Sequence, residues 1–331
     1  MKLHQSISIC IPNYNHGRVV KETIISALAQ QSENIEVIVS DNASTDDSHA
    51  VYQSFHGAHN LRIIHQSHTL PMTAHWNIFS SQAKGDWVLM LSSDDILLPD
   101  FYVKIAPFLS SDVDAIFFEY DYLYDRDGGR VSKVPFYGHD AVIDAAQQFR
   151  VFLKGNNFPL SVCLVRRELM DRIGWFNQTF NFCSDWHAWL DITSQAGKVA
   201  YIKSPLLLYR IHAQNETNRC VRNGSALREI IKMKTHFINQ AKEISDADRY
   251  ASIRNSLKLA EHYLAEVSEC GDEVRIIDYQ QQIVALQEEL SALDVPVNKS
   301  AMSGPPYPLP PASSIVEFSG NKAFDLCSIS V

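Results

Sequence analysis

Polar side chains gather in three loops, each of which follows a stretch predicted to be a strand. In chain order the loops read Pro12-Asn13-Tyr14-Asn15, Asp41-Asn42-Ala43-Ser44-Thr45-Asp46 and Ser92-Ser93-Asp94-Asp95. An ionised carboxylate accepts hydrogen bonds and donates none, so it can take an N–H from a ligand. Ligands of open parallel sheets bind in the crevice beyond the carboxyl ends of the strands. Three such loops together predict a ligand site along one edge of a sheet.

Each loop taken alone also has an explanation that needs no ligand. The loop 12–15 contains typical turn residues. Asp41 could be a turn carboxylate, with Ser44 or Asp46 capping the next helix. The pair Asp94-Asp95 could likewise cap a following helix. The first predicted strand is not followed by G-x-G-x-x-G, and no G-x-x-x-x-G-K-[ST] occurs, so dinucleotide and P-loop sites lose their main support.

The elements that would position these loops alternate between strand and helix. Short apolar runs predict strands, and apolar residues three or four apart predict helices. Over the first 120 residues the predicted strands span 6–11, 35–40, 61–65, 87–91 and 115–120, and the predicted helices span 18–31, 46–55 and 72–81. Such alternation with short links predicts an α/β fold with a mostly parallel, doubly wound sheet flanked by helices.

The second half of the chain is less regular. A short helix is predicted at 185–193, and strand material at 199–209 is interrupted by Pro205. A charged helical region follows at about 225–293, and the tail beyond it is rich in proline over 303–314. That composition is typical of a linker.

Composition and charge exclude several classes of protein. The chain has 331 residues, of which 46% are hydrophobic and 20% charged, as in a soluble globular protein. A formal net charge of -9 argues against nucleic acid as a partner. No apolar run approaches the roughly 20 residues of a membrane span, and the N-terminal stretch does not resemble a signal peptide. The six cysteines form no CxxC pair, which suits a reducing compartment and predicts a cytoplasmic protein.

Several segments resemble family-2 glycosyltransferases in their order and spacing. These segments are SICIPNYNHGRVVKETIISALAQQ, IEVIVSDNASTDDS, GDWVLMLSSDD with ILLPD behind it, CSDWHAWLDI and LLLYRIHAQN. They extend over residues 6–215, about two thirds of the chain. The resemblance implies a GT-A type, Rossmann-like catalytic domain over 1–220, a helical extension over 221–294 and a Pro-rich flexible tail over 295–331.

The same resemblance implies an inverting enzyme that moves a sugar from a nucleotide-diphosphate donor to an acceptor hydroxyl. Cell-surface polysaccharide or glycan synthesis is the expected setting, with a glycan or lipid-linked glycan as the acceptor. The alternative is a non-catalytic nucleotide-sugar or glycan-binding protein on the same fold, which a serine at position 92 keeps open. A nucleotidyltransferase is disfavoured because the first loop lacks the glycine-rich, basic character that binds a triphosphate.

Donor binding is assigned to the polar loops by this resemblance. Pro12 and Tyr14 are expected to shape the nucleotide pocket, and Asp41 to accept a hydrogen bond from the base. Uracil, thymine and guanine all offer such an N–H, so the nucleotide is left open. The other expected donor-binding residues are Asn15, Asn42, Ser44, Ser92 and Asp95.

The loop after the fourth strand corresponds to the family's metal site, usually written Asp-x-Asp. Here it reads Ser92-Ser93-Asp94, so the first acidic position is serine and Asp94 is the expected ligand. A divalent cation, Mn²⁺ or Mg²⁺, would offset the repulsion between Asp94 and a diphosphate and stabilise the leaving group. His212, in a YRxH motif, is expected to complete the site, and an imidazole ligand favours Mn²⁺.

Asp185 corresponds to the family's general base, which takes the proton of the acceptor hydroxyl. Its alternative role is an N-cap of the helix that begins there. The nearby aromatic residues could form a wall under an acceptor sugar or belong to the core. These residues are Trp175, Phe176, Trp186 and His187.

The helices over 225–293 are open to three interpretations. They could cover the acceptor cleft, mediate self-association, or lie on the inner face of a membrane that carries lipid-linked acceptors. Their mixed charge fits a solvated bundle better than a basic membrane-binding face.

Overall fold

The computed structural model describes residues 5–30, 32–125, 128–212, 216–241, 244–269 and 271–293. The Pro-rich tail predicted at 295–331 lies outside these residues, as do Cys270 and Cys327. The other four cysteines are buried free thiols, as expected for a reducing compartment. They are Cys10, Cys163, Cys183 and Cys220.

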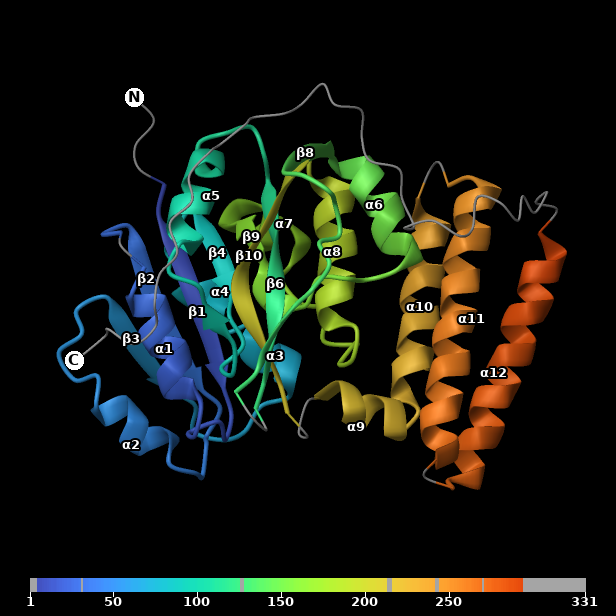
Figure 1. Ribbon diagram of the computed structural model, residues 1–331, viewed down its shortest axis with the longest axis horizontal. Coiled ribbons are helices and arrows are strands. Elements are labelled where there is room, and N and C mark those ends of the chain that lie inside the picture. Colours follow the sequence, from blue (N-terminus) through green and yellow to red (C-terminus); the bar gives the residue numbers. More distant parts are fainter. Residues whose placement is uncertain are drawn as a thin grey trace.

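A ten-stranded sheet forms the centre of the molecule (Figure 1), in the order β3-β2-β1-β4-β9-β6-β10-β5, with β7 beside β6 and β8 beside β10. The strands are β1 (Ile7–Asn13), β2 (Ile35–Asp41), β3 (Leu61–His65), β4 (Trp87–Met90), β5 (Ile96–Leu97), β6 (Ala115–Tyr124), β7 (Arg130–Ser132), β8 (Ala141–Asp144), β9 (Cys163–Arg166) and β10 (Lys198–Ile211).

The direction of the strands confirms the prediction of a mostly parallel sheet. The strands β3, β2, β1 and β4 are mutually parallel, and so are β6 and β10. Because β9 is antiparallel to both β4 and β6, the two parallel groups point the same way. The short antiparallel strands β5, β7, β8 and β9 were not predicted. The helices flank this sheet, and the fold is of the predicted α/β class.

The helices of the sheet region are α1 (Val20–Leu28), α2 (Ser48–Gln53), α3 (Met72–Trp76), α4 (Phe79–Gln82), α5 (Phe101–Leu109), α6 (Ala145–Lys154), α7 (Arg167–Ile173) and α8 (Ser184–Gln195), with a 3-10 turn η1 at Leu160–Val162. The single helix predicted at 72–81 is interrupted after Trp76 by a turn at Asn77 and Ile78. The Asn77 amide donates to the carbonyl of Phe176 at 2.8 Å and accepts from its N–H at 2.9 Å. The Asn77 side chain thus binds a distant segment at the point where the helix is interrupted, and hydrophobic periodicity does not predict such a contact.

The carboxyl ends of the parallel strands lie at one edge, as predicted. Asn13, the last residue of β1, is opposite Asp41, the last residue of β2. The residue after β4, Leu91, donates its N–H to Cys10 of β1 at 2.8 Å. The three polar loops therefore leave the sheet side by side.

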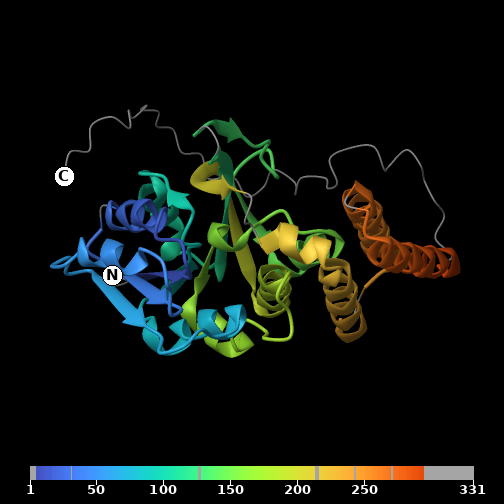
Figure 2. The same ribbon diagram turned by 90° about the horizontal axis from the view of Figure 1, so that it is seen from below.

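A helical region follows the sheet, also as predicted, with α9 (Glu216–Arg222), α10 (Ser225–Gln240), α11 (Asp246–Glu269) and α12 (Glu273–Ala292). In both views α10 stands beside α6 and α8, and α12 lies outermost (Figures 1 and 2). The apolar face of α10 joins the same hydrophobic cluster as the sheet. That face contains Leu227, Ile230, Met233 and Phe237.

Candidate active site

A cavity of about 520 Å³ lies where the three polar loops meet the first turn of α8. It is lined by Pro12, Asn13, Tyr14, His16, Asn42, Thr69, Leu70, Met72, His75, Trp76, Ser92, Ser93, Asp94, Pro159, Leu160, Asn181, Phe182, Ser184, Asp185, Tyr209 and His212. Seven of the predicted site residues are in this lining, namely Pro12, Tyr14, Asn42, Ser92, Asp94, Asp185 and His212. The other four, Asn15, Asp41, Ser44 and Asp95, are not part of the lining.

Asn15 and Ser44 join the first two loops to each other. Asn15 donates its backbone N–H to Ser44 Oγ at 2.9 Å, and its side-chain oxygen accepts from the Thr45 N–H at 2.8 Å. Asn15 has a φ of 55°, a left-handed conformation that asparagine tolerates better than most residues. These residues therefore shape the loops that face the cavity.

Asp41 is fully buried beneath the loop. Its Oδ1 accepts from the Tyr52 hydroxyl at 2.9 Å and from the Asn13 amide at 3.3 Å, and its Oδ2 accepts from the Ser44 N–H at 3.0 Å. Burial alone would raise the pKa of Asp41, but the hydrogen bonds from Ser44, Tyr52 and Asn13 outweigh it and lower that pKa. Asp41 is thus an ionised anchor whose direct neighbour, Asn42, lines the cavity.

Two histidines that the sequence did not single out accompany Asp41. His49 of α2 and His65 at the end of β3 stack at 4.9 Å between ring centroids. One ligand atom from each of Asp41, His49 and His65 lies within 4.8 Å of the others, a grouping that could hold a metal ion. This cluster is separate from the predicted metal ligands.

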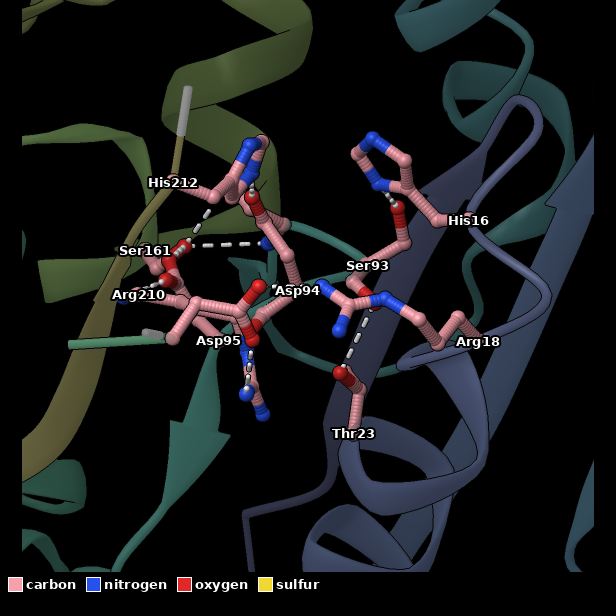
Figure 3. Close-up of polar contacts among 11 residues, drawn as sticks. His16, Arg18, Thr23, Ser93, Asp94, Asp95, Ser161, Arg210 and His212 are labelled. Carbon is pink, nitrogen blue, oxygen red and sulfur yellow. Dashed lines mark hydrogen bonds and ion pairs between the residues drawn. The ribbon is translucent and has the colours of Figure 1, made fainter. Parts of the chain in front are cut away.

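The predicted metal ligands Asp94 and His212 point at each other across the cavity wall (Figure 3), with Oδ2 and Nε2 2.8 Å apart. At this distance the two side chains are hydrogen-bonded to each other. A carboxylate with an imidazole also suits the chemistry of Mn²⁺.

Arg210 holds the Asp94 loop in place through two hydrogen bonds. Its Nε donates to the Asp94 carbonyl at 2.7 Å, and its backbone N–H donates to Asp95 Oδ1 at 3.0 Å. The guanidinium also forms ion pairs with Glu22 at 2.6 Å and Asp125 at 3.4 Å. The loop is thereby tied to α1 and to the end of β6, which leaves little freedom for Asp94.

Asp95 faces away from the cavity and binds Ser161 of η1. Ser161 Oγ donates to Asp95 Oδ2 at 2.6 Å and accepts from the Ser92 N–H at 2.9 Å. Burial, followed by the charge of Asp94, raises the pKa of Asp95 well above its usual range. Neither Asp94 nor Asp95 caps a helix, since α5 begins only at Phe101 and its N-cap is Asp100.

His16 is a cavity residue that the sequence analysis missed. Its Nδ1 lies 2.8 Å from Ser93 Oγ, and its ring meets that of His212 edge to face at 5.9 Å between centroids. Burial lowers the pKa of His16. Its position directly after the loop 12–15 was the available signal.

Asp185 lies in the first turn of α8 and reaches the cavity. Burial raises the pKa of Asp185 to about 7. The N-cap of the helix is Cys183, whose side chain makes no capping bond, so the predicted N-cap role of Asp185 is not what the structure shows. A carboxyl group with this pKa is about half ionised at neutral pH and can exchange a proton there.

Of the two alternatives for the aromatic residues near Asp185, the structure confirms the core role. Trp175, Phe176, Trp186 and His187 are all buried in the core and are not part of the cavity lining. Phe176 packs edge to face on Trp76 of α3, Trp186 donates its Nε1–H to the Phe152 carbonyl of α6, and His187 packs on Phe237 of α10. The aromatic side chains that line the cavity are Tyr14, Trp76, Phe182 and Tyr209.

The described residues that line the cavity include no lysine or arginine. Its ionisable side chains are Asp94, Asp185, Tyr14, Tyr209 and three histidines.

Comparison with known proteins places the chain in a family. It matches the family described as Glycosyl transferase family 2 over residues 8–174, half of its length. This region contains the three polar loops.

Curated relatives show the same relationship at low identity. The glycosyltransferase GlyG of Streptococcus pneumoniae serotype 4 is 28% identical over 225 residues, which cover 63% of this chain and 71% of GlyG. WfaP of Escherichia coli, a UDP-Glc:alpha-D-GlcNAc-diphosphoundecaprenol beta-1,3-glucosyltransferase, is 26% identical over 234 residues, covering 68% of this chain and 86% of WfaP.

Two solved structures share the fold. TarS 1–349 of S. aureus in complex with UDP-GlcNAc has a TM-score of 0.66 at 15% identity, over 86% of this chain and 80% of TarS. The mannosyltransferase PcManGT of Pyrobaculum calidifontis, in complex with GDP-Man and Mn²⁺, has a TM-score of 0.57 at 15% identity, over 89% of each chain. At such identity the similarity shows a common GT-A architecture.

Proposed function

Because this chain belongs to glycosyl transferase family 2, we propose that it transfers a sugar from a nucleotide-diphosphate donor to an acceptor hydroxyl with inversion. A divalent cation assists the transfer, and the product is part of a cell-surface polysaccharide or glycan. The catalytic domain spans 1–220, and the helices over 221–294 are an extension of it.

One observation carries this proposal: a single cavity contains both a carboxylate–imidazole pair and a second carboxyl group whose pKa lies near 7. The pair is Asp94 with His212, and the second group is Asp185. A protein that only binds a nucleotide sugar does not need a general base on the opposite side of the cavity. The combination therefore favours turnover over the non-catalytic alternative.

Donor recognition is proposed for the loops after β1 and β2. The Tyr14 ring, which is 49% exposed, offers a flat face for stacking with a base. Asn42 lines the same side, and Pro12 shapes it. Asp41 holds this wall in place, and a direct bond from Asp41 to a base N–H requires that the Asn13 amide at 3.3 Å give way.

Asp94 and His212 are the residues that would hold the cation. A divalent ion there neutralises the diphosphate and stabilises the charge of the departing group. The uncharged Ser92 leaves Asp94 as the one carboxylate of the triplet, and its position is secured by Arg210 through the Asp94 carbonyl at 2.7 Å. The support for Mn²⁺ is the imidazole ligand and the ion present with PcManGT.

Asp185 is proposed as the general base. As the acceptor oxygen forms its bond to the anomeric carbon, the hydroxyl proton passes to an Asp185 oxygen. The bond from that carbon to the diphosphate oxygen breaks, and its electron pair leaves with the nucleoside diphosphate. Burial has raised the pKa of Asp185 to about 7, so its ionised form is a stronger base than an ordinary aspartate.

The acceptor is proposed to be a glycan or a lipid-linked glycan, since the relative WfaP acts on a sugar bound to diphosphoundecaprenol. Such acceptors would place the reaction in the cytoplasm at the inner face of the membrane. Among the helices that the structure describes, none is long and apolar enough to cross a bilayer.

The test is a transfer assay with purified protein. Release of UDP, dTDP or GDP from a panel of nucleotide sugars is followed with Mn²⁺, with and without glycan and lipid-linked acceptors. We expect one donor to be consumed faster when an acceptor is present, with an inverted anomeric centre in the product by NMR. A protein that binds a donor but never releases its nucleotide would support the non-catalytic alternative instead.

A further inference from the structure

The helix that carries Asp185 begins without a cap of its own. Its N-cap residue is Cys183, whose side chain makes no capping hydrogen bond, and within the first turn the Trp186 N–H is accepted by Asp185 Oδ1 at 2.5 Å. The segment in front of the helix, Asn181 and Phe182, lines the cavity. The backbone N–H groups of this segment and of Cys183 are bound by an acceptor from a distant part of the chain.

Glu229 of α10 provides that support. Its Oε2 accepts the backbone N–H groups of Asn181 at 2.9 Å, Phe182 at 2.7 Å and Cys183 at 3.4 Å. A charged acceptor makes stronger hydrogen bonds than a neutral one. A negative charge at the start of a helix is also stabilised by the helix dipole. One carboxylate oxygen thus fixes three successive residues that lie 46 or more positions before it in the chain.

Further contacts align the helical region with α8. The Phe182 ring meets Tyr263 of α11 edge to face at 6.4 Å. Farther along α10, the Lys234 ammonium lies 5.0 Å from the centroid of Trp186, and Phe237 packs on His187 at 5.0 Å between rings. The first turn of α8 is therefore placed by α10 and α11 as well as by the sheet.

We propose that Glu229 is a positioning residue for the transfer reaction: it fixes the acceptor-side segment 181–183 and, through it, the orientation of Asp185. The helical extension is by this account part of the acceptor site. The inference rests on the proposed function, in which Asp185 takes the acceptor proton. Glu229 does not line the cavity and touches no reacting atom.

The experiment compares Glu229→Ala and Glu229→Gln with the wild-type chain. Glu261→Gln, an exposed position on α11, is the control for loss of a surface charge. Steady-state kinetics give kcat and the acceptor KM, and thermal shift gives donor binding and folding. Backbone hydrogen exchange of peptides covering 181–186 reports the contact itself without any need for activity.

We expect Glu229→Ala to lower kcat about 10²-fold, the size of loss that a misplaced catalytic group can cause. Glu229→Gln should lose less, about 10-fold, because an amide oxygen still accepts these bonds but more weakly. Donor binding should be unchanged in both, while exchange over 181–186 becomes faster. The control should match the wild type.

Two results would overturn the inference. One is wild-type kcat, acceptor KM and exchange in both Glu229 variants. The other is a loss of donor binding and melting temperature in step with activity, which would show a general effect on folding. If the wild-type chain transfers no sugar, the proposed function fails, and the exchange data still decide whether Glu229 holds segment 181–183.

Discussion

The two walls of the cavity are built in different ways. The wall proposed to bind the donor comes from the loops after β1, β2 and β4, all within the first 95 residues, and these loops bind one another and α1 directly. Asn15 joins Ser44 at 2.9 Å, and Thr23 of α1 donates to the Ser93 carbonyl at 2.9 Å. The acceptor wall is the start of α8, which depends on Glu229 and Tyr263 from the distant helices α10 and α11.

The two walls are therefore expected to have different roles. The donor wall contains side chains suited to a nucleotide and a cation, on loops that follow strands and have little freedom. The acceptor wall contains one carboxyl group, Asp185, whose value as a base depends on burial and orientation. Changes to the donor wall should therefore alter binding and metal dependence, and changes to the acceptor wall should alter turnover.

The largest effect is expected from Asp185→Asn. The amide cannot take the acceptor proton, so kcat should fall about 10³-fold, within the range that a general base contributes. Donor binding and the dependence on Mn²⁺ should stay as in the wild type. Steady-state kinetics at saturating donor measure this, with Asp112→Asn, whose side chain is 97% exposed, as the matched control. An Asp185→Asn enzyme with wild-type kcat would remove Asp185 from the mechanism.

Asp94→Ala should act on the opposite wall. Loss of the one carboxylate of the triplet Ser92-Ser93-Asp94 should lower kcat/KM about 10²-fold, since the cation's charge stabilisation is worth several kcal/mol. The remaining activity should respond weakly to added Mn²⁺. The check is a Mn²⁺ titration of the turnover rate, beside Asp185→Asn. If the titration curve keeps its wild-type midpoint, the cation lies elsewhere, and the cluster of Asp41, His49 and His65 becomes the next candidate.

A pH profile probes the acceptor wall without a mutation. Burial raises the pKa of Asp185 to about 7, and a base works only when deprotonated. Activity should therefore be present above pH 7 and lost as pH falls through it, about tenfold for each unit. The profile of kcat/KM shows this limb, because kcat/KM reports the pKa values of the enzyme without bound substrate. A plateau that continues well below that pKa would mean that Asp185 is either unperturbed or not the base.

Much of the fold was predictable because its signals are local. The strand β1 contains alternating isoleucines with buried neighbours, β2 contains the run Val37–Val39, and all four residues of β4 are apolar. The place of the short strand β9 between β4 and β6 depends instead on pairing across the chain. The contact of Asn77 with the distant Phe176 is likewise long-range.

The site residues, too, were predictable where the signal is local and not where it depends on long-range packing. Tyr14, Asp94, Asp185 and His212 stand in motifs with recognisable spacing, and the structure brings all of them to one cavity. The sequence did not distinguish the residues that face this cavity from those that support it, such as Asp95. That distinction depends on which way a side chain turns. Nothing in the sequence singled out Glu229, because its contacts with segment 181–183 form only when α10 packs against α8.

The central claim is that Asp94 binds the donor with a cation while Asp185 serves only the acceptor. A thermal-shift titration of the wild type, Asp94→Ala and Asp185→Asn with UDP, dTDP and GDP, with and without Mn²⁺, tests it most directly. A nucleotide at about 100 times its dissociation constant adds about 2.7 kcal/mol of stability. We predict a shift for one nucleotide that needs Mn²⁺, kept in Asp185→Asn and lost in Asp94→Ala. No shift in the wild type, or an equal shift in Asp94→Ala, would contradict the account.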